Sequence, residues 1–555
     1  MQFDAQGDAQ LDAERNARWN TVPDLVRHAA SRYGEREAVV EGRTRISYAE
    51  LGERVERAAA ACIARGVLRG DRVAVWAPNT LDWIVSALGA VTAGAVLVPL
   101  NTRFKGAEAA YVLRQSRTKL LFITGTFLGT SYVASLRRAA SEDPGGDPAD
   151  ALGEAPLPGL PHLTDVVVLA DDAVPSDFLT WKDFLAAGES VSGAAVRERA
   201  AQVAPSDPSD IVYTSGTTGR PKGAVITHAQ TLRAYDIWAD LAGLREGDRY
   251  LIVNPFFHTF GYKAGIIACL TRGATMVPQS VFNVDTVLAN IAAERISVLP
   301  GPPTLHQSLL DHPARASHDL TALRLVVTGA AVVPLQLVER LRSELHIATV
   351  LTAYGLSEAS GIVTMCRRGD APDVIAATSG RAIPGTEVRV EAAPGTPGEV
   401  LVRGFNVMQG YFEDPTGTDA AITEDGWLRT GDVGVLDESG NLRITDRIKD
   451  MFIVGGFNAY PAEIEQLLGL HPDIADVAVI GVPDPRLGEV GKAYVVRRPR
   501  PSPTLTADDV IAWSRREMAN YKVPRSVEFV SALPRNASGK VVKGELRGRG
   551  RERGV

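Results

Sequence analysis

The residues best suited to chemistry lie in one loop, Thr214–Lys222, which reads TSGTTGRPK. Glycine lets the backbone approach a ligand closely and adopt positive φ at little steric cost. Consecutive backbone N–H groups in such a turn form a nest that binds an anion, and phosphate is the usual ligand. The hydroxyl side chains add donors, and the lysine adds a positive charge. We therefore expect a phosphate-binding loop whose contacts are Thr214, Ser215, Gly216, Thr217, Thr218, Gly219 and Lys222.

This loop differs from the phosphate loop of P-loop NTPases, which has the pattern G-x-x-x-x-G-K-[ST] and leads into a helix. Here a proline, Pro221, interrupts that pattern, and an apolar run, Ala224–Ile226, follows. A second apolar run, Ile211–Tyr213, precedes the loop, so the pattern predicts a loop that joins two strands of a hairpin. The alternative interpretation is a surface loop rich in threonine and glycine, which the RPKG segment disfavours.

The run TSGTTGRPKG resembles the signature of the adenylate-forming superfamily, which contains acyl-CoA synthetases, peptide-synthetase adenylation domains and beetle luciferases. The resemblance covers nearly the whole chain, from Thr21 to Lys543. It implies that a carboxylic acid attacks the α-phosphate of ATP, that pyrophosphate leaves, and that the thiol of coenzyme A then takes the acyl group. Because the carboxylate and ATP are both negative, the first step depends mainly on positioning and charge neutralisation.

A second motif, Tyr354–Glu358, reads YGLSE and is similar to the Y-G-x-[ST]-E motif of the superfamily. Proteins usually bind Mg²⁺ through one or two carboxylates together with phosphate oxygens and water. The resemblance implies that Glu358 binds Mg²⁺, that Ser357 contacts phosphate, and that Tyr354 stacks on adenine beside Gly355. The alternative is a turn with a solvated glutamate, which the phosphate-loop motif disfavours.

Two further stretches are similar to nucleotide contacts of the superfamily. Gly329, Ala330 and Ala331 follow an apolar run and correspond to a backbone wall beside adenine and the acyl group. Asp432, in GWLRTGD, corresponds to the carboxylate that accepts both ribose hydroxyl groups, and Arg447 corresponds to a second ribose contact. The alternative for Asp432 is an Asx turn after a glycine.

The C-terminal part carries the remaining motifs. Lys540, in PRNASGK, is implied to bridge the incoming carboxylate and the α-phosphate from a loop that swings in. With Thr214, Lys222 and Glu358, it completes the catalytic set that the resemblance implies. The alternative for Lys540 is an ordinary solvated lysine. The resemblance makes Lys449 the hinge and places the pantetheine arm of coenzyme A along Gly455, Gly456, Phe457 and Asn458.

The stretch Asn254–Lys263, NPFFHTFGYK, is expected to border an apolar pocket for the acyl group. The expected lining residues are His258, Phe260, Tyr262 and Lys263, together with Gly329. For any one of these side chains the alternative is simple core packing. A lysine in an apolar run is costly to bury without a partner. Two interpretations of Lys263 therefore stay open: it pairs with a carboxylate elsewhere, or it donates to a polar oxygen of the acid, such as a ring ketone.

The acyl-pocket stretch, with LPGPPT (Leu299–Thr304) and LLDHPAR (Leu309–Arg315), resembles one subgroup of acyl-CoA ligases. These are the actinobacterial enzymes that activate the propanoate side chain on the C- and D-ring remnant of degraded sterols. The resemblance implies a bicyclic keto-propanoate as the acid. A medium- or long-chain fatty acyl-CoA synthetase, a ligase that loads a carrier protein, and a catalytically silent nucleotide-binding regulator stay open as alternatives. The presence of Glu358, Asp432 and Lys540 argues against the silent regulator.

The elements that must position these motifs alternate between helix-like and strand-like segments over residues 21–205. This alternation predicts an α/β fold of mainly parallel sheets with helices on their faces. A chain of 555 residues is too long for one core. We expect a large N-terminal domain (1–446) with a small β-barrel-like part, followed by a small mobile α+β domain (447–555), as in the superfamily. The Pro- and Gly-rich stretch Ala140–Pro161 is expected to be a mobile surface loop.

Composition excludes several classes of protein. The net charge of −7 gives no reason to expect nucleic-acid binding. The three cysteines are far apart, which indicates a reducing compartment, and the polar N-terminus is unlike a signal peptide, so we expect a cytoplasmic enzyme. The uncharged stretch Trp83–Thr102 approaches the length of a membrane span, but its composition favours a buried helix followed by a buried strand. We expect no integral membrane association. If the protein forms an oligomer, we expect a homodimer.

Overall fold

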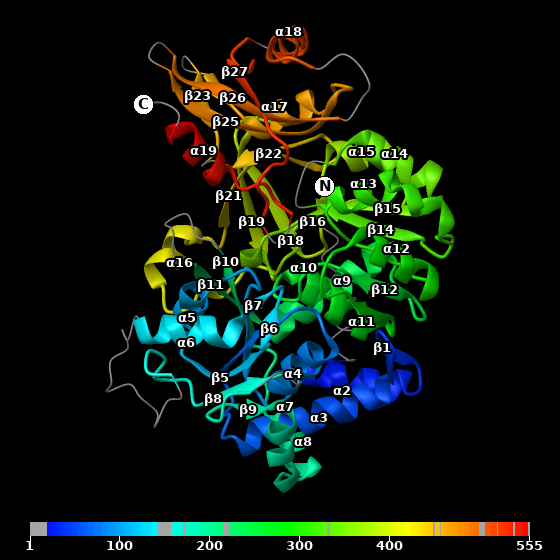
Figure 1. Cartoon of the computed structure of the whole chain (residues 1–555), viewed down its shortest axis with the longest axis vertical. Coiled ribbons are helices and arrows are strands. Elements are labelled where there is room, and N and C mark those ends of the chain that lie inside the picture. Colours follow the sequence, from blue (N-terminus) through cyan, green and yellow to red (C-terminus); the bar gives the residue numbers. More distant parts are fainter. Residues whose placement is uncertain are drawn as a thin grey trace.

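The computed structural model describes residues 19–142, 157–169, 174–214, 221–329, 333–447, 450–454, 457–484, 487–498, 505–518, 520–536 and 539–552. Helices pack around several sheets, and the C-terminal elements gather at one end of the molecule (Figure 1). This is the α/β class with a large N-terminal and a small C-terminal part that the sequence predicts.

The first sheet has eight strands in the order β20-β11-β10-β4-β3-β5-β8-β9. The strands from β10 to β9 are parallel, whereas β11 and β20 are antiparallel to their neighbours. Alternate residues of β3 enter two different cores, Val73 and Val75 on one face and Ala74 and Trp76 on the other, because helices cover both faces. The bounds are β3 Arg72–Trp76, β4 Val96–Pro99, β5 Thr118–Ile123, β8 Asp165–Val168, β9 Leu179–Thr180, β10 Pro208–Thr214, β11 Lys222–Thr227 and β20 Gly410–Tyr411.

A second layer contains two four-stranded sheets, with the strand orders β12-β13-β1-β2 and β14-β15-β16-β17. Val298 joins these two sheets, because it is bridged to Tyr250 of β12 and to Leu325 of β14. Because β12, β13, β14 and β15 are parallel, their carboxyl ends lie at one edge. The bounds are β1 Glu37–Glu41, β2 Thr44–Ser47, β12 Arg249–Ile252, β13 Thr275–Pro278, β14 Leu325–Gly329, β15 Thr349–Tyr354, β16 Thr364–Met365 and β17 Arg381–Ala382.

The helix α4, Leu81–Thr92, is buried over nearly its whole length and begins at the N-cap Thr80. It precedes the buried strand β4, so the expected helix and strand within Trp83–Thr102 are confirmed. Among the residues that the structure describes, no helix combines the length and the apolar character needed to cross a bilayer. The expected mobile surface loop Ala140–Pro161 is wrong at both described ends: Ala140–Glu142 belong to the helix α6, and Leu157 and Leu160 are buried in the core beside the first sheet. Residues 143–156 lie outside the described residues.

The other helices of the N-terminal part cover the sheets or connect their strands. Their bounds are α2 Val22–Tyr33, α3 Tyr48–Ala64, α5 Gly106–Gln115, α6 Tyr132–Glu142, α7 Trp181–Ala187, α8 Gly193–Ala201, α9 His228–Ala242, α10 Thr259–Gly261, the π-helix η3 Tyr262–Ile267, α11 Ala268–Arg272, α12 Val284–Ala293, α13 Pro303–Asp311, α14 Leu335–Glu344, the 3₁₀ helix η5 Ser357–Ala359, α15 Pro372–Ala377 and α16 Pro415–Ala421.

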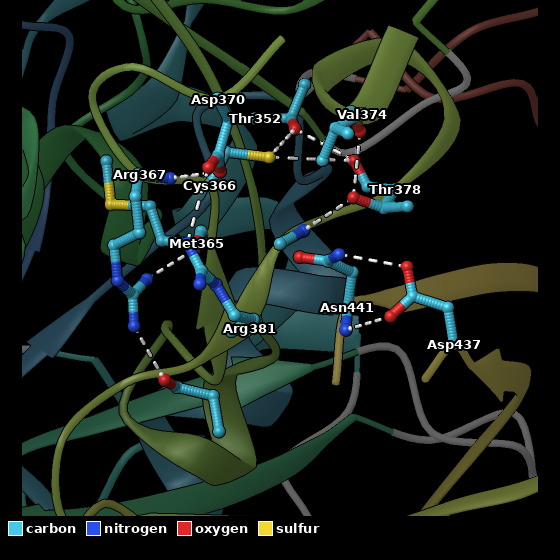
Figure 2. A network of polar contacts seen from close by, with 12 residues as sticks. Thr352, Met365, Cys366, Arg367, Asp370, Val374, Thr378, Arg381, Asp437 and Asn441 are labelled. Carbon is cyan, nitrogen blue, oxygen red and sulfur yellow. Dashed lines mark hydrogen bonds and ion pairs between the residues drawn. The ribbon is translucent and has the colours of Figure 1, made fainter. Parts of the chain in front are cut away.

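An antiparallel sheet, β18-β19-β21-β22, follows the second layer and corresponds to the expected β-barrel-like part. The bounds are β18 Thr386–Glu391, β19 Gly398–Gly404, β21 Leu428–Leu436 and β22 Leu442–Arg447. Polar contacts lie where this sheet meets β15, β16 and β17 (Figure 2). Thr352 Oγ1 donates to the carbonyl oxygens of Ile375 and Thr378, and Asn441 is bridged to Arg381. This junction holds the end of β15 close to the hairpin of β21 and β22.

The C-terminal elements form a sheet with a core of its own, which contains Phe452, Ile464, Val479 and Val495. This agrees with the expected separate α+β unit. The boundary between residues 446 and 447 stays a prediction, because Ile448 and Lys449 lie outside the described residues. The bounds are β23 Phe452–Val454, β24 Phe457–Ala459, α17 Pro461–Leu468, β25 Ile474–Asp484, β26 Gly488–Arg497, α18 Ala507–Glu517, β27 Ser526–Phe529 and α19 Lys543–Glu552.

Candidate active site

The expected phosphate loop connects two paired strands. The strands β10 and β11 are antiparallel, and Thr214 lies opposite Lys222 where the hairpin opens. The predicted hairpin is therefore confirmed. The loop residues Ser215, Gly216, Thr217, Thr218 and Gly219 lie outside the described residues, and their phosphate contacts stay a prediction.

The Glu358 carboxylate lies at the mouth of this hairpin. Its Oε1 accepts a hydrogen bond from the Thr214 hydroxyl at 3.0 Å and another from the Tyr411 hydroxyl at 3.1 Å. Burial and the Glu358 charge raise the pKa of Tyr411, so this phenol stays protonated and donates. Three elements that are far apart in the chain, β10, η5 and β20, thus hold one carboxylate beside the phosphate hairpin.

Lys222 lies on the other strand of the hairpin and makes two contacts that the sequence did not predict. Its Nζ is 2.9 Å from Asp414 Oδ2 and 5.1 Å from the centre of the Tyr411 ring. The ammonium group lowers the pKa of Asp414. In the sequence, Asp414 is followed by Pro415, a pair that predicts the start of a helix and gives no indication of a contact with Lys222.

Tyr354 and Asp432, two of the expected nucleotide contacts, lie beside each other, and their binding of a nucleotide stays a prediction. The Tyr354 hydroxyl donates to Asp432 Oδ2 at 2.6 Å, and Asp432 is buried. Asp432 lies opposite Arg447 in the pairing of β21 with β22, so the two expected ribose contacts are neighbours in the backbone. The side chain of Arg447 lies outside the described residues.

Two glycines of the expected nucleotide wall have no room for a side chain. A Cβ at Gly355 would lie 2.2 Å from the carbonyl oxygen of Gly361, and one at Gly329 would lie 2.6 Å from that of Ala353. Gly329 pairs with Ala353, the neighbour of Tyr354, so the two motifs are adjacent. Ser357 is buried in η5, whereas Ala330 and Ala331 lie outside the described residues.

The expected acyl segment begins in a loop that Asn79 fixes. Asn79 Nδ2 donates to the carbonyl oxygens of Ile252 and Asn254, and its Oδ1 accepts from the backbone N–H of Phe256. His258 then caps α10, because its Nδ1 accepts from the N–H of Phe260. Burial and, to a smaller extent, the charge of Lys540 lower the pKa of His258 to about 4. This imidazole is therefore neutral at neutral pH.

Lys263 has a carboxylate partner. Its Nζ lies 2.9 Å from Asp210 Oδ1, and neither side chain has any exposed surface. Asp210 Oδ2 also accepts from the hydroxyl groups of Ser209 and Thr231. The pairing interpretation of Lys263 is therefore confirmed. Tyr262 is also fully buried, so neither Tyr262 nor Lys263 presents an atom to a ligand in this conformation, and their place in the acyl pocket stays a prediction.

Lys540 approaches the site from the C-terminal part. Its charge acts on His258, and a Cβ built on its neighbour Gly539 would lie 3.4 Å from Pro302. The described end of this loop thus lies beside Pro302, and the catalytic role of Lys540 stays a prediction. The expected coenzyme A contacts are not placed in the same way: Gly455, Gly456 and the hinge Lys449 lie outside the described residues. Phe457 and Asn458 belong to β24, but their side chains are not described.

Residues 26–412 match the AMP-binding enzyme family, and residues 463–540 match the AMP-binding enzyme C-terminal domain. The chain is 50% identical over 527 residues (95% of this chain, 98% of the relative) to 3-[(3aS,4S,7aS)-7a-methyl-1,5-dioxo-octahydro-1H-inden-4-yl]propanoyl:CoA ligase of Rhodococcus jostii (strain RHA1). It is 51% identical, with the same coverage, to the ligase of that name from Mycobacterium tuberculosis (strain ATCC 25618 / H37Rv). The crystal structure of the anthranilate CoA ligase AuaEII in complex with anthranoyl-AMP has a TM-score of 0.81 and 25% identity, covering 95% of this chain and 97% of that one.

Proposed function

The chain belongs to the AMP-binding enzyme family and is an acid–thiol ligase that activates its acid with ATP, and from this premise we propose that the acid is a bicyclic keto-propanoate derived from steroid rings. The observation that carries this proposal is the 50% and 51% identity, over 95% of the chain, to two ligases named for such an acid. Family membership alone does not choose the acid, because a structural relative is named for anthranilate.

We propose that the reaction has two steps. The carboxylate of the acid attacks the α-phosphorus of ATP and pyrophosphate leaves, which gives an acyl adenylate. The thiol of coenzyme A then attacks the acyl carbon of the adenylate and AMP leaves. The enzyme needs no nucleophile of its own for either step, and the three cysteines are buried.

The mouth of the β10–β11 hairpin is suited to the triphosphate. Lys222 is held there by Asp414 and would contact the β- and γ-phosphates, and the loop that follows Thr214 would supply backbone N–H groups. Tyr354 and Asp432, joined at 2.6 Å, would bind adenine and ribose. These roles follow from the contacts around the hairpin and from the resemblance of the motifs.

Glu358 is the residue that would hold Mg²⁺. Its carboxylate accepts hydrogen bonds from two hydroxyl groups, Thr214 and Tyr411, and a hard oxygen of this kind suits Mg²⁺. The described residues contain no group of three or more His, Cys, Asp or Glu side chains that could hold a metal ion by themselves. One carboxylate with phosphate oxygens and water is a common set for Mg²⁺. Bound there, the ion would neutralise phosphate charge.

Lys540 would act on the carboxylate and the α-phosphate. It lies close enough to His258 to influence the pKa of the imidazole. Because His258 is neutral, it adds no positive charge that would repel the ammonium group. Lys540 can therefore counter the repulsion between the two anions, which is the main electrostatic demand of the first step.

The test is pyrophosphate release with a panel of acids at equal concentration: the bicyclic diketo-propanoate, the same ring system without its ketones, octanoate and palmitate. We expect the highest kcat/KM for the diketo acid. A preference for octanoate or palmitate would favour a fatty acyl-CoA synthetase. Activity only with a carrier protein in place of coenzyme A would favour a loading enzyme, and no adenylate with any acid would favour a silent nucleotide-binding protein.

A further inference from the structure

Arg103 reaches from the first sheet to the loop that carries Lys540. Its Nη1 donates to the carbonyl oxygen of Arg535 at 3.1 Å. Arg103 is exposed and lies in the turn that follows β4. Since β4 pairs with β10, this turn extends from the same sheet as the phosphate hairpin. The contact joins the turn after β4 to the segment that leads to Lys540.

The turn that carries Arg103 is held firmly. The Trp76 indole N–H donates to the carbonyl oxygen of Asn101 at 3.0 Å, and the Tyr132 hydroxyl donates to that of Thr102. The rings of Trp76 and Tyr132 stack with their centres 4.3 Å apart. The backbone N–H of Arg103 donates to Asn101 Oδ1 at 2.9 Å. Because its base is fixed in this way, the Arg103 side chain can act as a support for another segment.

The described residues around Lys540 are joined by several hydrogen bonds. The Arg535 guanidinium donates to the carbonyl oxygen of Gly539 at 2.5 Å and to Asp476 at 2.5 Å. The backbone N–H of Asn536 donates to the carbonyl oxygen of Lys540 at 2.8 Å, and Asn536 Oδ1 accepts from the N–H of Lys540 at 2.9 Å. These contacts tie the described residues on both sides of positions 537–538 to one another, so a contact on Arg535 also limits where Lys540 can go.

We propose that Arg103 is a positioning residue that holds the Lys540 loop over the site during adenylate formation, an inference that rests on the proposed function. The contact contributes to the first step, because two anions must meet there. Once the adenylate has formed, the carboxylate charge is gone and the thiol must reach the acyl carbon. In the second step Lys540 no longer has to counter the repulsion between two anions, so the contact between Arg103 and Arg535 is not needed there.

The experiment separates the two steps in the full chain. Adenylate formation is followed as pyrophosphate release in a single turnover, and thioester formation is followed from supplied acyl adenylate and coenzyme A. The substitution Arg103→Ala is expected to slow adenylate formation about three- to tenfold, the range for one hydrogen bond. In the same variant, we expect the KM for ATP and the rate of thioester formation to stay within about twofold of the wild-type values. Arg103→Lys keeps a donor and is expected to restore part of the rate.

The matched control is Arg27→Ala, which removes an exposed arginine whose partner is Asp24 on α2. This variant is expected to leave both rates unchanged. Equal losses in both steps for Arg103→Ala, a loss in thioester formation alone, or no loss would each overturn the inference. Failure of the proposed substrate is a separate result, because any acid that the wild type converts serves in this experiment. If the wild type forms no adenylate with any acid, the proposed function fails and the inference falls with it.

Discussion

Lys263 and Asp210 place two opposite charges where neither has any exposed surface. Removing both ions from water is expensive, and their attraction offsets this only if each keeps its partner. Burial lowers the pKa of Lys263, and the Asp210 charge acts in the opposite direction. The sequence left two interpretations of Lys263 open, a carboxylate partner or a substrate oxygen. It could not identify Asp210, because the pair joins η3 to β10, which are far apart in the sequence.

Replacing Lys263 by Met leaves a buried carboxylate without its counter-ion, and we expect the protein to lose about 3–5 kcal/mol of stability. The double variant Lys263→Met/Asp210→Asn removes both charges and is expected to recover a large part of that loss. The urea midpoint of the full chain measures both. As a control, Lys119→Met breaks the partly exposed pair with Asp71 and is expected to change stability by about 0–1 kcal/mol. A double variant no more stable than the single one would contradict this account.

Two buried histidines, His228 and His306, predict how stability depends on pH. Burial lowers the pKa of each to about 4, whereas an unfolded histidine has a pKa of about 6.5. Between these values the unfolded chain binds more protons than the folded one. Stability is therefore fully present above pH of about 6.5 and falls as the pH drops toward about 4, by on the order of 3 kcal/mol for each residue.

We expect the urea midpoint to fall with pH across this window and His306→Gln to reduce the slope. The exposed residue His346 supplies the control, because His346→Asn should leave the slope unchanged. Equal slopes for the wild type and His306→Gln would show that the buried imidazole is not the group that titrates.

Glu358 is the residue at which the metal prediction is tested. Glu358→Gln is expected to raise the Mg²⁺ concentration needed for half-maximal adenylate formation by at least about tenfold, since losing even an outer-shell partner costs about 10–100-fold in metal affinity or activity. Tyr411→Phe removes only a hydroxyl that contacts Glu358 and should have a smaller effect. The control is Glu413→Gln, because Glu413 is exposed and lies two residues after Tyr411 in the sequence. An unchanged Mg²⁺ requirement in Glu358→Gln would rule out this residue as the ligand.

At the scale of single elements, the sequence predicted best where the signals are local. The helix α17 runs over Pro461–Leu468, and the proline at its start and the glycine after its end predict these bounds within a few residues. The strand β25 extends on both sides of its apolar run Val477–Gly481, since its pairing with β26 continues past that run. The sequence did not predict the π-helix η3.

Gly261 shows how packing between elements limits the acyl segment. A Cβ there would lie 2.1 Å from the carbonyl oxygen of Pro255 and 2.4 Å from that of Asn254, so the loop before α10 would have to move. We expect Gly261→Ala to cost about 1–3 kcal/mol and to raise the KM for the acid. The control is Gly548→Ala in the middle of α19, where a Cβ would meet nothing within 4 Å. This change should stabilise the protein by about 0.5–1 kcal/mol. Thermal unfolding and acid kinetics measure both variants, and equal effects would contradict this packing argument.

At the scale of the whole molecule, the candidate site is assembled from separate sheets. The first sheet supplies Thr214 and Lys222, the second layer supplies Tyr354, and the antiparallel sheet supplies Asp432. Motifs identified most of these residues, but the sequence could not predict Tyr411 and Asp414 as partners of Glu358 and Lys222. Those contacts depend on β20 joining the edge of the first sheet, next to β11.

We expect Lys540, which the C-terminal part supplies, to serve the activation of the acid rather than the transfer to coenzyme A. The most direct measurement compares Lys540→Ala with the wild type in adenylate formation and in thioester formation from supplied acyl adenylate. We predict a loss of at least about 100-fold in the first step, as when a preorganised electrostatic group is removed, with the second step nearly unchanged. Adenylate formation at the wild-type rate, or an equal loss in both steps, would contradict the account.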